Sequence, residues 1–224
     1  VYTKTRRVYD MIWLRIHDQM LPSFTQNGGH FPLPEQSMYF GRPGLSRWVT
    51  PIDDTNTMVI AWRHFRDGEH DDPKGLTNKN EVGFGKTDFY GQSADRPYEL
   101  RQRDPGDYDA WVSQGPINIH KREHTAVTDR GVSLVRRRLR KYIRQVQEGK
   151  AVKHPTDVFN NPIPTYGGDT MLRIPPQSGM DDDDLIKQVA HKVAAIYIAH
   201  DQYVGQERVE KLSQALRNYE ASWT

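Results

Sequence analysis

The order of the hydrophobic periodicities is the feature that most restricts how this 224-residue chain can fold. Between residues 8 and 17, four apolar residues share one parity, as they do in a half-buried strand: Val8, Ile12, Leu14 and Ile16. Over residues 132–146 and 186–197, apolar residues instead recur every three or four positions, which is helical spacing. Strands first and helices last predict an α+β fold, an antiparallel β-sheet with helices packed on it.

A β-hairpin is predicted over residues 47–65. Its strands would be residues 47–51 and 57–65, because the apolar run from Met58 to Trp62 suits a strand. The polar segment Asp53-Asp54-Thr55-Asn56 lies between them, and its short side chains can bond to the backbone of a turn.

Three stretches without periodicity are predicted as loops: residues 31–44, 67–106 and 151–179. The first holds three prolines and the third holds five, and proline interrupts regular structure. The second is about 40 residues long, which is too long for an idle connection, so we expect it to carry function.

The second half of the chain is predicted to be helical. Gly115-Pro116 cannot lie inside a normal helix, so residues 108–114 and 117–123 should form separate turns. A longer helix should begin at a Thr128 or Asp129 cap and end at Gly149. Another should begin at Asp181 to Asp184, whose carboxylates complement the helix dipole, and the last should cover residues 206–219.

Charge and cysteine content exclude several classes of protein. Lys and Arg number 31 and Asp and Glu 29, and this net charge of +2 is too balanced for a nucleic-acid or membrane-surface protein defined by bulk charge. The absence of Cys excludes disulfides, thiolate zinc sites, cysteine-bound iron–sulfur clusters and a cysteine nucleophile in this chain. Any metal must therefore be bound by His, Asp or Glu. Because no apolar run approaches about 18 residues, a soluble, cytoplasmic protein is expected.

The strongest local charge feature is the run Arg136-Arg137-Arg138-Leu139-Arg140-Lys141, followed by Arg144. A nucleic-acid surface would need these cations on one face with aromatic partners, and the run is instead interpreted as wrapping round the helix. We therefore expect a solvated face or pairing with nearby acids, with docking of an acidic partner as the alternative.

The segment His120-Lys121-Arg122-Glu123-His124 matches the H-x-x-E-H pattern of inverted zincins. On a helix this spacing puts two imidazoles one turn apart beside a carboxylate, so a zinc hydrolase is one hypothesis. The pattern is short, no third ligand is marked, and Gly115-Pro116 disturbs the helix just upstream. A surface helix with polar neighbours is the alternative.

Three acids lie where the long loop meets the first helical turn: Asp104, Asp107 and Asp109. Acids at helix starts usually cap the helix. A carboxylate near apolar neighbours such as Trp111 can instead bind a cation, since a partly buried acid needs a partner. These residues alone leave both roles open.

A longer set of residues follows Asp107 in a defined order: Ser113, Gly115-Pro116, Glu123-His124, Thr128-Asp129 and Arg136 to Arg138. Upstream lie the segment from Trp48 to Met58 and the Asn-rich segment Asn78-Lys79-Asn80. Together they resemble the C-terminal catalytic region of Rieske non-haem iron ring-hydroxylating oxygenases, with the phthalate-dioxygenase-like branch nearest. The resemblance covers most of residues 48–146.

This resemblance implies a mononuclear Fe(II) held by two His and one carboxylate, which activates O2 with electrons from a Rieske [2Fe–2S] cluster. Asp107 takes the carboxylate position. The implied fold is a helix-grip, or START-like, antiparallel sheet over a long helix, assembled as a homotrimer. The implied substrate is an aromatic or related ring compound, and a ferredoxin or flavin reductase would supply electrons. Neither nucleic acid nor a membrane is expected as a partner.

Two departures from the family pattern concern the metal centre. Gly106 stands where the family often has Gln before the ligand acid. The paired His ligands and the cluster ligands of the family come from a segment expected to precede residue 1, so this chain alone should bind iron poorly. His17, His30 and His64 are expected to be surface or satisfied histidines.

All 224 residues are therefore interpreted as the C-terminal part of an oxygenase catalytic domain. Its expected regions are strands and hairpin (1–66), long loop (67–106), ligand-bearing helical region (107–150), and loop with C-terminal helices (151–224). Candidates for the substrate pocket are Ile60, Trp62, Tyr108 and Trp111, with ordinary core burial as the alternative. The competing function is a stand-alone helix-grip ligand-binding domain without redox activity.

Overall fold

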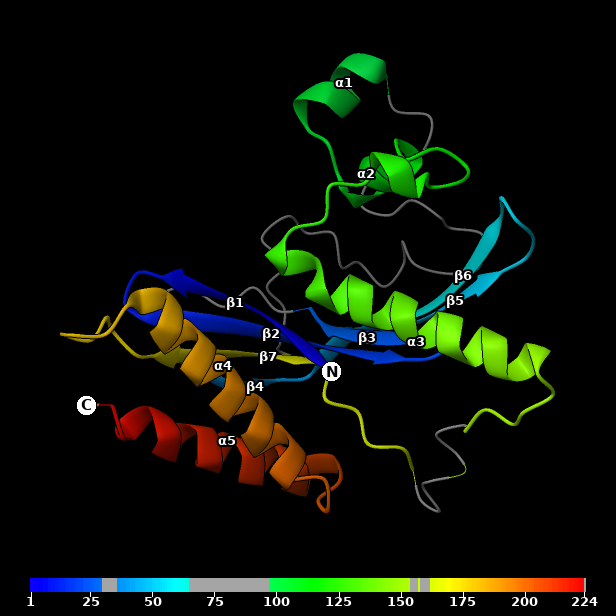
Figure 1. Cartoon of the computed structure of the whole chain (residues 1–224). Coiled ribbons are helices and arrows are strands. Elements are labelled where there is room, and N and C mark those ends of the chain that lie inside the picture. The colour runs from blue at the N-terminus through cyan, green and yellow to red at the C-terminus, as the bar shows by residue number, and fades with distance from the viewer. Residues whose placement is uncertain (30–35, 65–96, 154–156, 158–161, 224) are drawn as a thin grey trace. The chain divides into compact units, whose positions relative to one another are not determined.

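The computed structural model describes residues 1–29, 36–64, 97–153, 157 and 162–223 of the chain (Figure 1). The chain divides into two compact units. One comprises residues 1–49, 59–64 and 128–224, and the other comprises residues 50–58 and 65–127.

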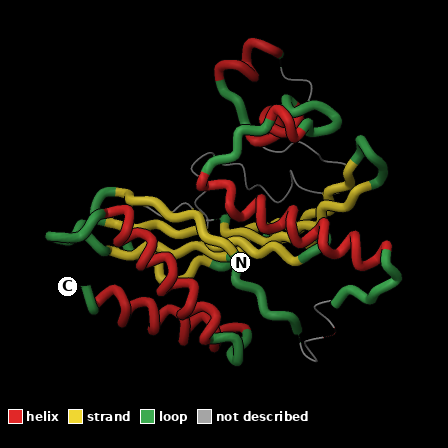
Figure 2. Tube along the Cα trace, viewed as in Figure 1, coloured by secondary structure: helices red, strands yellow, loops and turns green. Residues whose placement is uncertain are grey.

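The described elements are an antiparallel sheet and several helices, so the predicted α+β class is confirmed (Figure 2). In chain order they are β1 (Tyr2–Val8), β2 (Met11–Met20), β3 (Phe24–Gly28), β4 (Met38–Gly41), β5 (Pro43–Pro51), β6 (Thr57–Arg63), α1 (Tyr98–Arg103), α2 (Asp107–Val112), α3 (Arg130–Gln147), β7 (Gly168–Arg173), α4 (Asp182–Ala199) and α5 (Gly205–Ala221). The helix-grip form of this class stays a prediction.

β2 is the strand around which the sheet is built, since it pairs antiparallel with β1, β3 and β7. The strand order is β4-β7-β2-β3-β5-β6, with β1 paired to β2 outside this path. The prediction of a loop over residues 151–179 is wrong at β7, which lies inside the sheet. Five of the six residues of β7 are buried, so both of its faces are covered and no polar alternation marks it in the sequence.

The single strand predicted over residues 8–17 is also wrong, because the chain reverses within it. β1 ends at Val8 and β2 begins at Met11, in register from Val8 opposite Met11 to Tyr2 opposite His17. Tyr9 lies at the turn with a φ of 54°, a left-handed conformation that usually calls for Gly or Asn. The sequence therefore carries no ordinary turn signal at this reversal.

Two predicted loops contain regular structure in their described parts. β4 and the start of β5 lie within residues 31–44, and α1 lies within residues 67–106. Residues 30–35 and 65–96 lie outside the described part of the chain, and with them lies the Asn-rich segment Asn78-Lys79-Asn80.

The predicted hairpin is confirmed as β5 and β6. In its turn, the Oδ1 atom of Asp53 accepts hydrogen bonds from the backbone N–H groups of Thr55 and Asn56, both at 2.8 Å. These bonds, with the one from the side chain of Asn56, hold the pKa of the Asp53 carboxyl below its usual range. The sequence therefore predicted both the strands and the chemistry of the turn.

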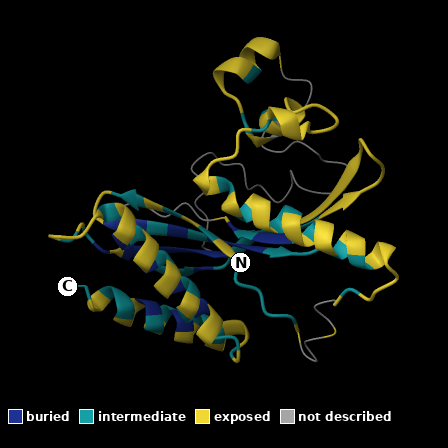
Figure 3. Ribbon diagram, viewed as in Figure 1, coloured by how far each residue is buried: buried dark blue, intermediate teal, exposed yellow. Residues whose placement is uncertain are grey.

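The hydrophobic core lies between the sheet and the helices α4 and α5 (Figure 3). Its fully buried members are Ile12, Leu14, Ile16, Leu172, Ile174, Leu185, Val189, Val193, Tyr197, Leu212 and Leu216. Burying one such aliphatic side chain contributes roughly 1.5–3 kcal/mol to stability.

The predicted acidic start of α4 is confirmed, because the Asp181 side chain accepts bonds from the N–H groups of Asp183 and Asp184 at 3.0 and 3.2 Å.

α3 follows its prediction closely. It begins after Asp129, although the side chain of Asp129 makes no capping bond, and it ends just before Gly149, whose φ is 69°. A positive φ at that place is typical of a glycine that stops a helix. None of the residues of α3 is buried, so this helix leaves side chains on all sides accessible.

Candidate functional site

The carboxylate predicted to bind the metal lies at the start of α2. Gly106 is extended, with φ −121° and ψ −177°, and Asp107 is the first residue of the six-residue helix. The Asp107 side chain is exposed, and it makes no hydrogen bond or ion pair with any described residue. No described residue therefore occupies its carboxylate oxygens.

The Asp109 side chain, in the same helix, instead caps the start of α2. Its Oδ2 atom accepts a hydrogen bond from the backbone N–H of Gly106 at 2.9 Å, and its Oδ1 lies 4.0 Å from Nε of Arg101. Asp104 ends α1, where its backbone N–H donates to the carbonyl of Leu100. Of the three candidate acids, Asp109 is thus the one whose side chain secures the start of a helix.

A hollow of about 430 Å³ lies between α1 and α2. Arg101, Asp109 and Ala110 are among its lining residues, whereas Asp107 and Trp111 are not. Since both helices belong to the same compact unit, this hollow is a feature of that unit alone. Asp109 is the one acid among its described lining residues, and a single carboxylate does not make a metal site.

Within the described ranges, no three side chains of His, Cys, Asp or Glu gather closely enough to hold a metal ion. In this described part of the chain, Asp107 is therefore not a member of a complete metal-binding cluster. A mononuclear iron site of the two-His, one-carboxylate type needs two imidazoles besides it. Asp107 fits one position of that set and leaves two to be supplied from elsewhere.

The H-x-x-E-H segment does not form the helix that a zinc site of that kind requires. Residues His120–Arg122 form one short 3₁₀ turn, and Glu123 is already extended, with φ −81° and ψ 137°. Nδ1 of His120 lies 3.4 Å from a carboxylate oxygen of Glu123, so these two side chains face each other at the surface. The two imidazoles are not one α-helical turn apart, which weakens the zinc-hydrolase hypothesis.

The predicted pocket residues of β6 lie on one side of the strand. Ile60 and Trp62 are two positions apart, and their exposed fractions are 54% and 63%. The ring of Trp62 contacts that of Trp48 edge-to-face at 5.2 Å, and Trp48 contacts Phe24 in the same way at 5.1 Å. This aromatic row crosses β3, β5 and β6.

The other two pocket candidates lie in α2. Trp111 is half exposed, and the side chain of Tyr108 lies outside the described part of the chain. The four candidates are divided between the two compact units, so the described contacts leave their shared pocket a prediction.

A polar row beside the aromatic one was not singled out from the sequence. Nε2 of His64 lies 2.9 Å from the Ser46 hydroxyl, which accepts a bond from the Gln26 amide at 2.8 Å. Ser46 and Gln26 are buried, whereas His64 is exposed. His64 directly follows β6 and has the parity of Trp62 in that strand, as Ser46 has the parity of Trp48 in β5. That shared parity is the signal that could have connected them.

His17 was predicted to be a surface histidine or one with all its hydrogen bonds satisfied. In the structure it is buried, and one of its ring nitrogens has no partner among the described residues. Its exposed fraction is 7%, its ring stacks on Tyr2 at 4.7 Å, and its Nε2 atom has no hydrogen-bond partner among the described residues. Burial, followed by the nearby cations Lys4, Arg15 and Arg47, lowers the pKa of His17 to about 4. The ring is thus neutral at physiological pH. His30 lies outside the described residues.

None of the described helices combines the length and the apolar character that a membrane crossing needs.

Comparison with curated proteins gives two relatives. The oxygenase subunit of tert-butanol monooxygenase / tert-amyl alcohol desaturase from Aquincola tertiaricarbonis is 36% identical over 230 aligned residues, which cover 99% of this chain and 47% of that protein. Phenoxybenzoate dioxygenase subunit alpha from Ectopseudomonas oleovorans is 41% identical over 111 residues, 48% of this chain and 24% of that protein. The chain thus spans about half the length of the first relative. No protein-family model and no solved structure matches the sequence.

Proposed function

This chain belongs with the α subunits of Rieske-type oxygenases, and on that premise we propose that it is the C-terminal part of the catalytic domain of an O2-dependent oxidoreductase. The observation that carries the proposal is the similarity to an oxygenase subunit over 99% of the chain. Because the chain spans 47% of that relative, the activity proposed is that of the full-length subunit.

In this proposal Asp107 is the carboxylate ligand of a mononuclear Fe(II). Its support is local: Asp107 is exposed and has no partner among the described residues, whereas the Asp109 carboxylate accepts the backbone N–H of Gly106. Two His ligands and the Rieske [2Fe–2S] cluster would come from parts of the subunit outside this sequence. When bound, iron held by two imidazoles and one carboxylate keeps open positions at which O2 can be activated.

The substrate proposed is an aromatic or related ring compound that undergoes hydroxylation. The names of the relatives concern a tertiary alcohol and a phenoxybenzoate, so the two proteins differ in what they act on. For this chain, Ile60 and Trp62 of β6 and Tyr108 and Trp111 of α2 are the proposed pocket residues. The accessible rings of Trp62 and Trp111 suit contact with an apolar substrate.

The proposed electron donor follows from the reaction, and the proposed assembly from the family resemblance. Activation of O2 consumes electrons, and we propose a ferredoxin or flavin reductase as their source. A cytoplasmic homotrimer is proposed for the full-length subunit, with no part for a membrane or a nucleic acid.

The test is the iron content of the full-length subunit after reconstitution with Fe(II). Asp107→Ala should lose most of the bound iron, since two imidazoles alone hold Fe(II) poorly, whereas the matched variant Asp104→Ala, at an acid outside α2, should retain it. The visible spectrum of the [2Fe–2S] cluster should be unchanged in both variants. Full iron occupancy in Asp107→Ala would overturn the ligand assignment. A wild-type subunit without iron and without a cluster spectrum would favour the redox-inactive ligand-binding domain instead.

A further inference from the structure

The cations of α3 are concentrated on one face of the helix. Arg137, Arg140, Lys141 and Arg144 are spaced i, i+3, i+4 and i+7, which places them above one another on a single side. The apolar residues Val135, Leu139, Tyr142 and Val146 are spaced i, i+4, i+7 and i+11, which places them on the opposite side. The prediction that the Arg-rich run wraps round the helix is therefore wrong for these four cations, which we call the basic face. Arg136 and Arg138 lie at its flanks.

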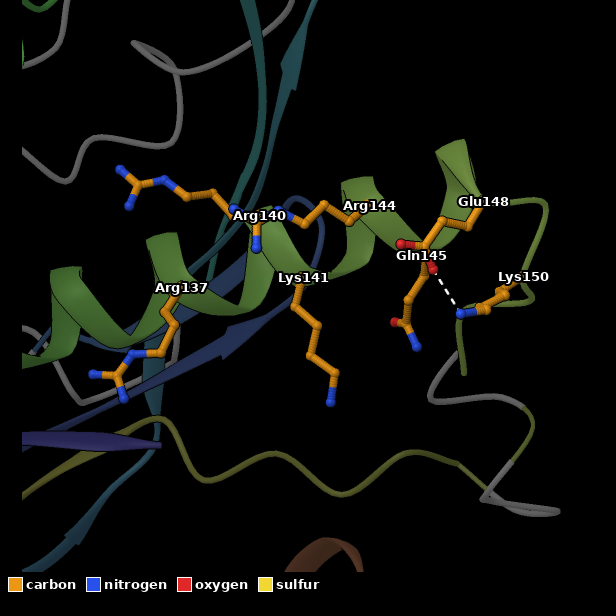
Figure 4. Close-up of a pocket in the computed structure, with 7 residues that line it drawn as sticks. All are labelled: Arg137, Arg140, Lys141, Arg144, Gln145, Glu148 and Lys150. Carbon is orange, nitrogen blue, oxygen red and sulfur yellow. Dashed lines mark hydrogen bonds and ion pairs between the residues drawn. The ribbon is translucent and has the colours of Figure 1, made fainter.

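The basic face borders a hollow of about 540 Å³ that Gln145, Glu148 and Lys150 complete (Figure 4). Within it, the Lys150 ammonium donates to the Glu148 carboxylate at 2.6 Å. The four cations of the basic face are exposed and have no hydrogen bond or ion pair with any described residue. With five cations and one acid, the described lining residues carry a charge of +4, against +2 for the whole chain.

Several kinds of partner could neutralise this positive charge, and the arrangement of side chains on α3 helps to decide between them. A helix that lies on a membrane buries its apolar stripe in the lipid and keeps its cations on the polar side. In α3 three residues of the stripe, Val135, Leu139 and Tyr142, are already partly buried within the protein, which disfavours a lipid surface as the partner. Among the described residues, no aromatic side chain lines the hollow, which disfavours stacking of single-stranded nucleic acid bases. A permanent subunit interface would be more apolar than this lining of long charged side chains.

An acidic protein surface that binds and leaves quickly fits all these features. Arg presents planar donors that match carboxylates, and Arg supplies three of the four cations of the basic face. Electron-transfer complexes are small and transient, and opposite charges on their surfaces speed the encounter. We infer that the basic face of α3 docks the acidic surface of the protein that delivers electrons to this oxygenase. The inference rests on the proposed function and names the partner surface on this chain.

The experiment uses the full-length subunit and a [2Fe–2S] ferredoxin with an acidic surface as the reduced donor. Stopped-flow absorbance would follow reduction of the subunit's cluster at increasing ferredoxin concentration and at several ionic strengths. Arg140→Glu and Arg144→Glu should each lower the second-order rate constant by about tenfold at low salt, with the limiting rate at saturating ferredoxin unchanged. The salt dependence of the wild type should weaken in both variants.

The matched control is Arg138→Glu, which changes the charge equally on the same helix but outside the hollow, and its rate constant should stay within about twofold of the wild type. Equal losses in all three variants, or a loss of the limiting rate, would overturn the docking surface. A change of oligomeric state in Arg140→Glu would assign the basic face to a second copy and would also overturn it. If the wild-type subunit shows no cluster spectrum, the proposed function itself has failed, which is a separate outcome.

Discussion

Asp107 and Asp109 lie two residues apart in the first turn of the same short helix, yet among contacts with described residues only Asp109 is held by its neighbours. Its carboxylate accepts the Gly106 N–H at 2.9 Å and approaches Arg101, while the Asp107 carboxylate is exposed and without a partner in the described part of the chain. A helix of six residues has little stability of its own, so the capping acid maintains the backbone that carries the free one. Under the proposed function, Asp109 would support the helix and Asp107 would be the ligand.

Asp109→Ala should therefore loosen α2. Loss of the carboxylate leaves the Gly106 N–H without its acceptor, and removing a capping side chain costs about 1 kcal/mol. Hydrogen exchange of the amides between residues 106 and 113 should become faster by about fivefold, while the global unfolding midpoint changes little. Asp107→Ala is the matched control and should leave these exchange rates as they are. Equal acceleration in both variants would contradict the division of roles.

The sequence predicted the parts of the fold where one periodicity or one cap dominates. The hairpin with its Asp53 turn and the helix after Asp181 were both predicted correctly, because short-range bonds decide them. β7 was missed because its partners are distant in the chain: Leu14 of β2 lies opposite Thr170, about 150 residues away. The reversal at Tyr9 was missed because a tertiary pairing, not a Gly or Asn, imposes its positive φ.

A second prediction concerns Asp18, which ties the segment before β7 to β2. Its buried carboxylate accepts the backbone N–H groups of Tyr166 and Gly167, both at 2.6 Å. Asp18→Ala would leave two N–H groups without an acceptor, and we expect the free energy of unfolding to fall by about 3 kcal/mol. Chemical denaturation measures this loss. Asp18→Asn keeps one acceptor oxygen and should lose about half as much, so equal stability of Asp18→Ala and wild type would refute the role.

A third prediction concerns the ion pair between β2 and β7. Arg15 donates to Asp169 at 2.7 Å, and the side chain of Asp169 is fully buried. Asp169→Leu would leave the Arg15 guanidinium partly buried without its acid and should destabilise the protein by about 3–5 kcal/mol. The double variant Arg15→Met/Asp169→Leu removes both charges and should recover much of that loss. Thermal and urea unfolding of the three proteins measure the coupling, and a double variant no better than Asp169→Leu would contradict it.

Only the part of the candidate site that lies within one continuous sequence motif could be predicted. Asp107 could be singled out by its order before Ser113 and Gly115-Pro116, since those positions lie close together in the chain. The row of Gln26, Ser46 and His64 could not, because it forms only when β3, β5 and β6 pair. An isolated histidine in a sequence carries no sign of which strand will lie beside it.

The last prediction is a dependence of stability on pH through His17. The pKa of this ring is about 4 in the folded protein, first because it is buried and then because Lys4 and Arg15 repel a further positive charge. In the unfolded chain the pKa is about 6.5. Above pH 6.5 both states are neutral, and the contribution of His17 to stability is fully present. As the pH falls from 6.5 toward 4, the unfolded chain takes up a proton that the folded protein does not, so the free energy of unfolding decreases.

The loss through His17 should be on the order of 2–3 kcal/mol and should level off below pH 4. Urea unfolding between pH 4 and 7 measures it, with His17→Phe as the variant, because a phenyl ring can still stack on Tyr2 and does not titrate. The variant should lose this part of the pH dependence, whereas His191→Phe, at an exposed position of α4, should keep it. If wild type and His17→Phe lost stability in parallel as the pH fell, His17 would titrate as a solvent-exposed histidine does and its burial would have no thermodynamic consequence.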